Sequence, residues 1–365
     1  MERADVLIVG GGPAGSSCAE TLVAAGLDVL VLDRLAFPRD KPCAGWITPE
    51  VVAALRLDLG EYARDRTLQP ISRFRIGRIG GRPADVDYGA PVSFGIRRCE
   101  FDAFLLRRSR APARLGEAVA DLRREGREWV VNGRFAARVL VGAGGHFCPV
   151  ARALNGPPPR ASTVVAREIE FRLEGEALAA CRVEGERPEL YFCPDLRGYG
   201  WCFRKGSHLN VGFGRLGERA LPVRVAAFVE WLARAGRIAR PPDEGWRGHA
   251  YVVRESRPRR VAGDGVLLAG DAAGLAFPAS GEGILPAVAS GRLAAEAVLQ
   301  ERDEARCERL YRERLDEVLG RPASAPSWLR PLAARAAGVL LASPAFSRRV
   351  VLDQWFLHRG SALAV

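Results

Sequence analysis

Short apolar runs separated by glycines are the clearest pattern in the first part of the chain. Residues 6–9 form a continuous apolar run, as expected for a parallel strand buried on both faces. Residues 10–15 are rich in glycine, and the small residues that follow predict a helix ending near Ala25. A second apolar run, residues 29–32, ends at Asp33. The pattern therefore predicts a strand, a turn, a helix and a second strand.

The turn matches the GxGxxG pattern, and its residues are Gly10, Gly11, Gly12, Pro13, Ala14 and Gly15. Gly10 permits the sharp turn, Gly12 lets backbone amides approach a pyrophosphate, and Gly15 lets the helix pack closely on the strand. Asp33 can accept both hydroxyl protons of an adenosine ribose. In this strand and helix context the motif predicts a dinucleotide site in preference to a glycine turn without a ligand.

A second set of motifs lies late in the chain. The apolar run 266–269 ends at Gly270 and Asp271, and Gly281 and Gly283 precede a small-residue helix that begins near Ile284. With the first motif, this pattern resembles the flavoprotein superfamily that includes para-hydroxybenzoate hydroxylase. The resemblance implies FAD as cofactor, with Asp271 on its ribityl chain and the helix N-terminus beside the flavin. The alternative is an ordinary aspartate in a turn after a strand.

Three further segments resemble the geranylgeranyl reductase family. Residues 37–45 are similar to its PRxKxCGG segment, with Ala44 in place of the first glycine. Residues 98–105 match RxxFDxxL, and residues 199–204 match YxWxFP with arginine in place of proline. The resemblance covers residues 6–292 and implies further cofactor contacts from Arg34, Arg39, Lys41, Cys43, Ala44, Gly45, Arg98 and Gly144.

Several of these residues have alternative roles. Arg39 and Lys41 are expected to hold the FAD diphosphate or an anionic substrate headgroup, or else to decorate a loop. The resemblance places Cys43 near the active site as a catalytic proton donor, with a disulfide or simple burial as alternatives.

Tyr199, Trp201 and Phe203 alternate at period two, which places their rings on one face of a strand. We expect them to act in catalysis as the wall of an apolar tunnel, where their π faces could stabilise positive charge on an alkene carbon. The alternative is that they fill the core.

One segment departs from the pattern of the hydroxylases in this superfamily. After the predicted strand 139–142 the chain continues with Gly144, Gly145 and His146, where those enzymes usually carry an Asp-Gly pair. No second GxGxxG follows a strand. The electron donor therefore stays open between NAD(P)H and another donor. The four histidines lack the spacing of metal ligands, so no metal is expected.

The composition and charge of the chain bear on its binding partners and its cellular location. The chain has 54 Lys+Arg against 43 Asp+Glu, a net charge of +11, but its arginine clusters lack the interleaved aromatics of a nucleic-acid site. Eight cysteines occur without a CxxC pair, and the N-terminus does not resemble a signal peptide. We expect a cytoplasmic protein. Peripheral membrane contact is an alternative, through an edge formed by Trp328, Leu332, Leu340 and Leu341.

The predicted fold class is α/β: a Rossmann-like FAD-binding domain of the GR2 type, an inserted, mostly antiparallel substrate domain, and C-terminal helices. The expected FAD-binding segments are 1–70, 96–155 and 262–320, the substrate domain is 71–95 and 156–261, and the helical segment is 321–365. The leading hypothesis is reduction of carbon–carbon double bonds in a prenyl or other hydrophobic substrate. The alternatives are a flavin monooxygenase and a noncatalytic flavin-binding protein at a membrane surface.

Overall fold

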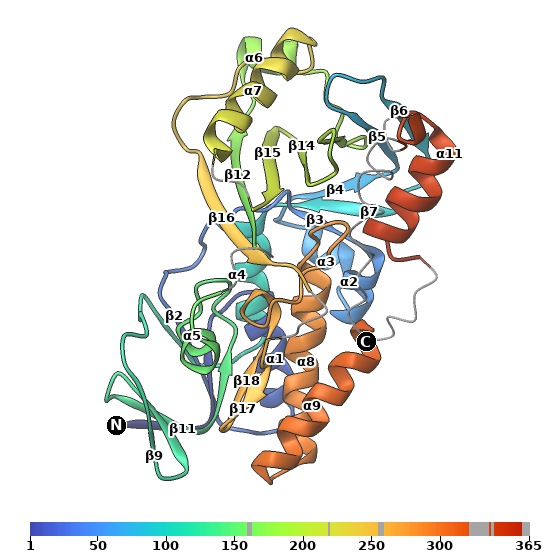
Figure 1. Ribbon diagram of the computed structural model, residues 1–365. Coiled ribbons are helices and arrows are strands. Elements are labelled where there is room, and N and C mark those ends of the chain that lie inside the picture. The colour runs from blue at the N-terminus through green and yellow to red at the C-terminus, as the bar shows by residue number, and fades with distance from the viewer. Residues whose placement is uncertain (159–162, 218–219, 255–258, 321–335, 337–338, 360–365) are drawn as a thin grey trace.

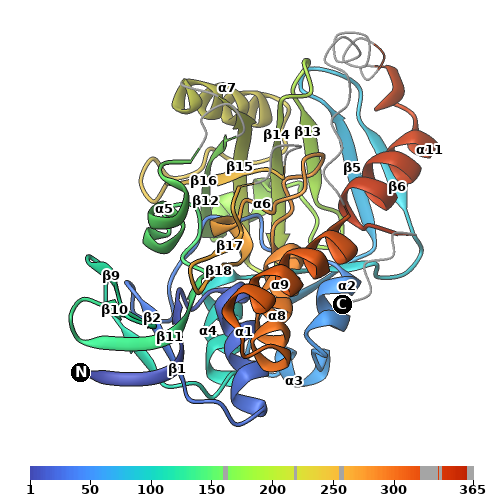
Figure 2. The ribbon, with the colours of Figure 1, turned by 60° about the horizontal axis from the view of Figure 1, so that its bottom comes forward.

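The computed structural model describes residues 1–365 except 159–162, 218–219, 255–258, 321–335, 337–338 and 360–365. In Figure 1 one half of the molecule carries a parallel sheet with its helices, and the other half carries a large antiparallel sheet. Figure 2 shows the same two halves from below. The predicted fold class is confirmed.

The first sheet is parallel through its central strands, with a hairpin attached at one side. Its main path runs β17 (Ala262–Gly263), β18 (Val266–Leu268), β11 (Phe135–Gly142), β1 (Glu2–Val9), β2 (Val29–Asp33) and β8 (Ala113–Leu115), and β10 (Glu128–Val131) and β9 (Leu122–Glu125) form the hairpin on β11. Val9 pairs with Gly142 on one side and with Leu32 on the other, so the carboxyl ends of β1, β2 and β11 meet at one edge.

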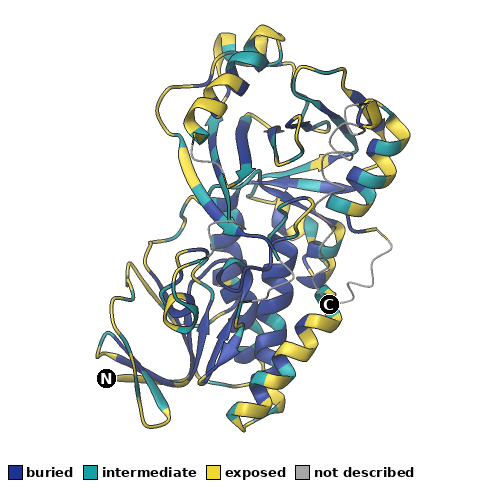
Figure 3. Ribbon diagram, in the orientation of Figure 1, coloured by how far each residue is buried: buried dark blue, intermediate teal, exposed yellow. Residues whose placement is uncertain are grey.

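Helices cover the first sheet, and their small residues allow close contact. They are α1 (Pro13–Ala24), α4 (Arg98–Arg108), α5 (Pro149–Asn155), α8 (Ile284–Gln300) and α9 (Glu304–Leu319). A Cβ on Gly291 of α8 would lie 2.1 Å from the carbonyl oxygen of Ala14 in α1. The buried strands and these two helices form the dark centre of Figure 3.

The second sheet has seven strands, and all its pairs are antiparallel except that of β13 with β5. Its order is β16 (Arg247–Val252), β12 (Thr163–Arg172), β15 (His208–Leu216), β14 (Gly198–Lys205), β13 (Glu189–Phe192), β5 (Arg73–Arg78) and β6 (Ala84–Asp87), with α6 (Gly175–Ala180) and α7 (Leu221–Arg234) beside it. Apolar residues of α7 pack on one face of this sheet. Part of the opposite face packs on residues 351–357, and another part lines the cavity described below.

Smaller elements join the two halves. A three-stranded sheet has the order β3 (Trp46–Ile47), β7 (Ser93–Ile96), β4 (Leu68–Ile71), and α2 (Pro49–Ala54) and α3 (Leu59–Ala63) lie near it. A 3-10 turn, η1 (Gly270–Ala272), follows β18. Near the C-terminus α11 (Pro344–Phe346) continues into a π-helical segment, η2 (Ser347–Phe356).

Two expectations concern the C-terminal region and the membrane. Trp328 and Leu332 lie outside the described residues, whereas Leu340 is exposed and Leu341 is buried in the core. Within the ranges that the structure describes, no helix combines the length and hydrophobicity needed to cross a bilayer.

Candidate functional site

A cavity of about 520 Å³ lies where the carboxyl ends of β1, β2, β11 and β18 face the second sheet. The β1–α1 turn, the loop before β3 and the loop before α8 contribute to its wall. Residues of β12, β14 and β16 form the opposite wall, and Phe356 of η2 contributes an aromatic ring. Segments far apart in the sequence thus line one cavity.

The β1–α1 turn depends on its glycines. A Cβ on Gly10, whose φ is 113°, would lie 2.4 Å from the carbonyl oxygen of Ala143, and a Cβ on Gly15 would lie 1.8 Å from the carbonyl oxygen of Gly10. Gly12 is the N-cap of α1 without a side-chain cap, and a Cβ there would be 3.3 Å from Nη2 of Arg39. The N-terminus of α1 therefore faces the cavity with an arginine beside it, which suits an anionic group.

Asp33 ends β2 at the cavity wall. Its Oδ2 accepts a hydrogen bond from the amide of Gly11 at 2.8 Å, and its Oδ1 accepts one from the amide of Leu35 at 3.0 Å. These bonds fix the carboxylate next to the glycine turn. Each carboxylate oxygen retains a further lone pair that can accept a hydroxyl proton.

A buried cluster of charges lies behind the turn. Nε and Nη2 of Arg98 donate to the two oxygens of Asp102, both at 2.9 Å, and Nη1 of Arg39 lies 3.1 Å from Oδ2 of the same aspartate. Although burial opposes its charge, Asp102 raises the pKa of Arg98 above its usual range. The cluster fixes the position of both arginines at the cavity wall.

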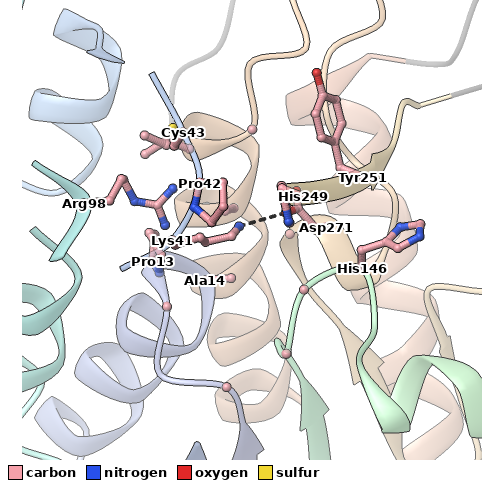
Figure 4. Close-up of a pocket in the computed structure, with 18 of the residues that line it drawn as sticks. Pro13, Ala14, Lys41, Pro42, Cys43, Arg98, His146, His249, Tyr251 and Asp271 are labelled. Carbon is pink, nitrogen blue, oxygen red and sulfur yellow. Dashed lines mark hydrogen bonds and ion pairs between the residues drawn. The ribbon is translucent and has the colours of Figure 1, made fainter. Parts of the chain in front are cut away.

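Lys41 and His249 converge on Asp271, as Figure 4 shows. Nζ of Lys41 is 2.9 Å from Oδ2 of Asp271, and Nε2 of His249 is 3.2 Å from the same oxygen. Burial disfavours the charge of Asp271, but the Lys41 ammonium outweighs it and holds the pKa of the carboxyl below its usual range. Burial and the same ammonium lower the pKa of His249. These lowered pKa values favour a charged carboxylate beside a neutral imidazole.

Aromatic rings line another part of the cavity. Tyr199 and Trp201 of β14 line it together with Trp46 and Phe356, whose rings stack at a centroid distance of 5.0 Å. The hydroxyl of Tyr199 donates to the carbonyl oxygen of Ser280 at 2.5 Å, which fixes the loop before α8 against β14. This bond joins the aromatic wall to the loop before α8.

Most of the sequence-predicted site residues line this cavity. They are Gly10, Gly12, Pro13, Ala14, Asp33, Arg34, Arg39, Lys41, Cys43, Ala44, Arg98, Gly144, Tyr199, Trp201, Gly270, Asp271, Gly281, Gly283 and Ile284.

Three predicted residues do not line it. Phe203 shares a face with Tyr199 and Trp201 but is buried in the core behind Trp46, at a centroid distance of 5.6 Å. Gly15 contacts Gly10 in the packing described above. Gly45 has a φ of 69°, and a Cβ there would lie 2.1 Å from the carbonyl oxygen of Ile96, so its place is set by packing on β7.

Several cavity residues were not predicted. His249 and Tyr251 alternate along β16, and Glu168 lies on β12. Glu282 lies inside the Gly281–Gly283 motif, and its burial raises its pKa to about 7. The alternation along β16 and the Gly281–Gly283 motif were the only sequence signals for these residues. They are weak signals, because polar residues on a strand usually indicate its solvent face.

The eight cysteines are all free thiols in the structure, which leaves no disulfide for Cys43. Its Sγ accepts a hydrogen bond from the amide of Gly45 at 3.4 Å, and the side chain lies at the cavity wall. Of the three roles expected for Cys43, the disulfide is therefore wrong.

Comparisons with known proteins agree with this geometry. Residues 3–64 match the model of the FAD binding domain family. The chain is 32% identical to a menaquinone reductase of Mycobacterium tuberculosis over 84% of this chain and 78% of that protein. It is 31% identical to a chloroplastic geranylgeranyl diphosphate reductase of Oryza sativa subsp. japonica over 81% of this chain and 66% of that protein.

A solved structure of a geranylgeranyl bacteriochlorophyll reductase-like protein from Thermoplasma acidophilum shares the fold. Its TM-score is 0.68 at 21% identity, and the match covers 96% of this chain and 99% of that one.

Proposed function

Starting from the fact that this chain belongs to the geranylgeranyl reductase family of FAD-dependent oxidoreductases, we propose that it reduces carbon–carbon double bonds of a polyprenyl substrate. The observation that carries the proposal is one cavity that joins a dinucleotide turn to an aromatic wall. Reduced FAD supplies a hydride when it is bound. The residues of the chain have to hold the cofactor, exclude water and deliver a proton.

The described residues fit FAD along the length of the cavity. The N-terminus of α1 and Arg39 would hold the pyrophosphate, and Asp33 would accept the ribose hydroxyl protons. Asp271, charged and fixed by Lys41, would accept ribityl hydroxyls. The proposed FAD-binding segments remain 1–70, 96–155 and 262–320.

The substrate would lie against the wall formed by Tyr199, Trp201 and Phe356. Apolar rings exclude water, which favours a prenyl chain over a polar substrate. The names of the two relatives agree, since menaquinone and geranylgeranyl diphosphate both carry prenyl double bonds. Segments 71–95 and 156–261 would form this substrate region, and Cys43 would lie beside the reacting alkene. Such a substrate is a lipid, so peripheral membrane contact belongs to the proposal.

An anaerobic reaction tests the proposed function. The FAD-loaded protein is reduced chemically, and geranylgeranyl diphosphate or a polyprenyl menaquinol, whose ring is already reduced, is added without oxygen. Return of the oxidised flavin spectrum supports the proposal, and the fully saturated analogues provide the control. Reoxidation that requires oxygen and yields a hydroxylated product would instead identify a monooxygenase. Binding of FAD with salt-sensitive binding to anionic liposomes and no turnover would indicate a noncatalytic protein.

A further inference from the structure

Two glutamates on the same face of β12 lie in opposite environments. Glu170 is paired with two cations, Nζ of Lys205 at 2.5 Å and Nε of Arg97 at 3.0 Å. Glu168, two residues earlier, is 7% exposed and lines the cavity. Among the ion pairs of the described residues none includes Glu168. The strand therefore carries one carboxylate with charge partners and one carboxyl without them.

Neutral hydrogen bonds hold Glu168 beside the aromatic wall. Nδ2 of Asn210 donates to Oε2 of Glu168 at 3.1 Å and to the carbonyl oxygen of Cys43 at 3.1 Å. Oδ1 of Asn210 accepts from Nε1 of Trp201 at 2.8 Å. One buried amide thus fixes Glu168 next to Trp201 and Cys43.

A glycine provides the space for this arrangement. Gly212 of β15 is the register partner of Glu168, and a Cβ there would lie 2.2 Å from Cζ2 of Trp201 and 2.9 Å from Cβ of Glu168. The strand therefore has no side chain at the position where the indole and the glutamate meet. A carboxyl buried without an ion-pair partner is costly in its charged form.

We propose that Glu168 is the proton donor of the reduction, giving its proton to the alkene carbon that does not receive the hydride. This inference rests on the proposed function. The π bond of the alkene breaks, one C–H bond forms with the hydride of reduced FAD, and the second forms with the proton of Glu168. The reduced flavin would lose two electrons and return to FAD, the alkene would gain them, and the Glu168 carboxylate would regain a proton from water.

The protonation state agrees with this role. Burial raises the pKa of Glu168 to about 7, against the opposing effects of the Cys43 backbone, Lys205 and Asn210, while Lys205 and Arg97 lower that of Glu170 despite its burial. In active sites, two neighbouring carboxyls with pKa values shifted in opposite directions are typical of a pair in which one acts as an acid and the other stays charged. The titratable and charged groups that interact with Glu168 are Glu170, Lys205 and Cys43. On the neighbouring strand β16, Arg247 is its register partner and His249 lies two residues further on.

The test compares Glu168→Gln with Glu174→Gln, an exposed glutamate just beyond the end of β12. Each is loaded with FAD, reduced, and mixed anaerobically with geranylgeranyl diphosphate or a polyprenyl menaquinol, whose ring is already reduced. Glu168→Gln should slow reoxidation by about 10²–10⁴-fold with the dissociation constant of FAD unchanged. In the unsubstituted protein and in Glu174→Gln the rate should fall as pH rises through about 7, since the donor must be protonated. That dependence should be absent from Glu168→Gln.

A second readout needs no cofactor. The infrared difference between the unsubstituted apoprotein and Glu168→Gln should contain a protonated carboxyl band that disappears as pH rises through about 7. If Glu168→Gln does not retain FAD, Glu168→Asp keeps the acid and should keep the pH dependence at a reduced rate.

Three outcomes overturn the inference while the proposed function stands. In the first, Glu168→Gln has the same rate and pH dependence as the unsubstituted protein. In the second, the infrared band of Glu168 is that of an ionised carboxylate already well below neutral pH. In the third, the pH dependence is lost in Glu282→Gln or Cys43→Ala instead. If the unsubstituted protein reacts with neither prenyl compound, the proposed function fails and the inference fails with it.

Discussion

Nζ of Lys41 lies 2.9 Å from Oδ2 of Asp271, which joins the loop after β2 to the turn after β18, 230 residues later in the chain. The contact links two segments, far apart in the sequence, that both line the cavity (Figure 4). It also keeps a buried carboxylate charged.

Lys41→Met should lower the free energy of unfolding by about 1.5–3 kcal/mol near neutral pH, since it leaves Asp271 buried without its ammonium partner. Lys41 lowers the pKa of Asp271 in the folded protein. The difference in unfolding free energy between the unsubstituted protein and Lys41→Met should therefore be largest above the usual pKa of 3.8 and shrink as pH falls below it. Urea unfolding at several pH values measures the difference. Arg3→Met, which removes an exposed pair with Glu128, should change stability by less than about 1 kcal/mol. An equal loss in both variants would contradict the account.

Gly15→Ala should abolish FAD retention and destabilise the protein, because the new Cβ would lie 1.8 Å from the carbonyl oxygen of Gly10. The matched control is Gly26→Ala after the other end of α1, where no atom lies within 4 Å and φ is 83°. It should cost only about 1 kcal/mol and keep FAD. Flavin absorbance per protein and thermal unfolding measure both effects. Normal FAD content in Gly15→Ala would show that the β1–α1 turn is misplaced.

Phe356→Leu should shift the substrate preference towards longer prenyl chains, because Phe356 lines the cavity and stacks on Trp46. Phe203→Leu is the control, since Phe203 packs near Trp46 without lining the cavity. Both should lose stability, by about 1–3 kcal/mol, but only Phe356→Leu should raise kcat/KM for the longer of two prenyl diphosphates relative to the shorter. An equal shift in both variants would indicate a general loosening of the core.

Glu282→Gln should become more stable relative to the unsubstituted protein as pH rises from about 4.5 to about 7. Burial raises the folded pKa of Glu282 above the unfolded value, so in this window the unfolded chain releases the proton that the folded protein keeps. The folded state therefore loses up to about 3 kcal/mol of stability, a loss that glutamine avoids. Urea unfolding across this pH range gives the difference, and Glu174→Gln should show no such trend. A difference that does not vary with pH would contradict the raised pKa.

Much of the FAD-binding half could be predicted, because its motifs are formed by residues close together in the sequence. The turn from Gly10 to Gly15 needs glycines at fixed spacing, and Asp33 and Asp271 each follow a buried apolar strand. Parallel strands bring their carboxyl ends to one edge, so two distant motifs could be placed together.

The substrate side could not be predicted in the same way. Glu168 lies in a strand of alternating residues, where a polar side chain ordinarily faces solvent, and only the docking of two sheets encloses it. His249 meets Asp271 through that same packing. Phe203 shares a strand face with Trp201, yet the ring of Trp46 separates it from the cavity, which no periodicity reveals.

The most direct test of the account is a single anaerobic turnover analysed by mass spectrometry. The FAD-loaded protein is reduced and mixed with geranylgeranyl diphosphate or a polyprenyl menaquinol, whose ring is already reduced. Both the flavin spectrum and the product mass are recorded. The account predicts that each flavin oxidised yields one product molecule two hydrogen atoms heavier, with one prenyl double bond lost. Flavin that stays reduced until oxygen is admitted, with no prenyl double bond lost, would contradict it.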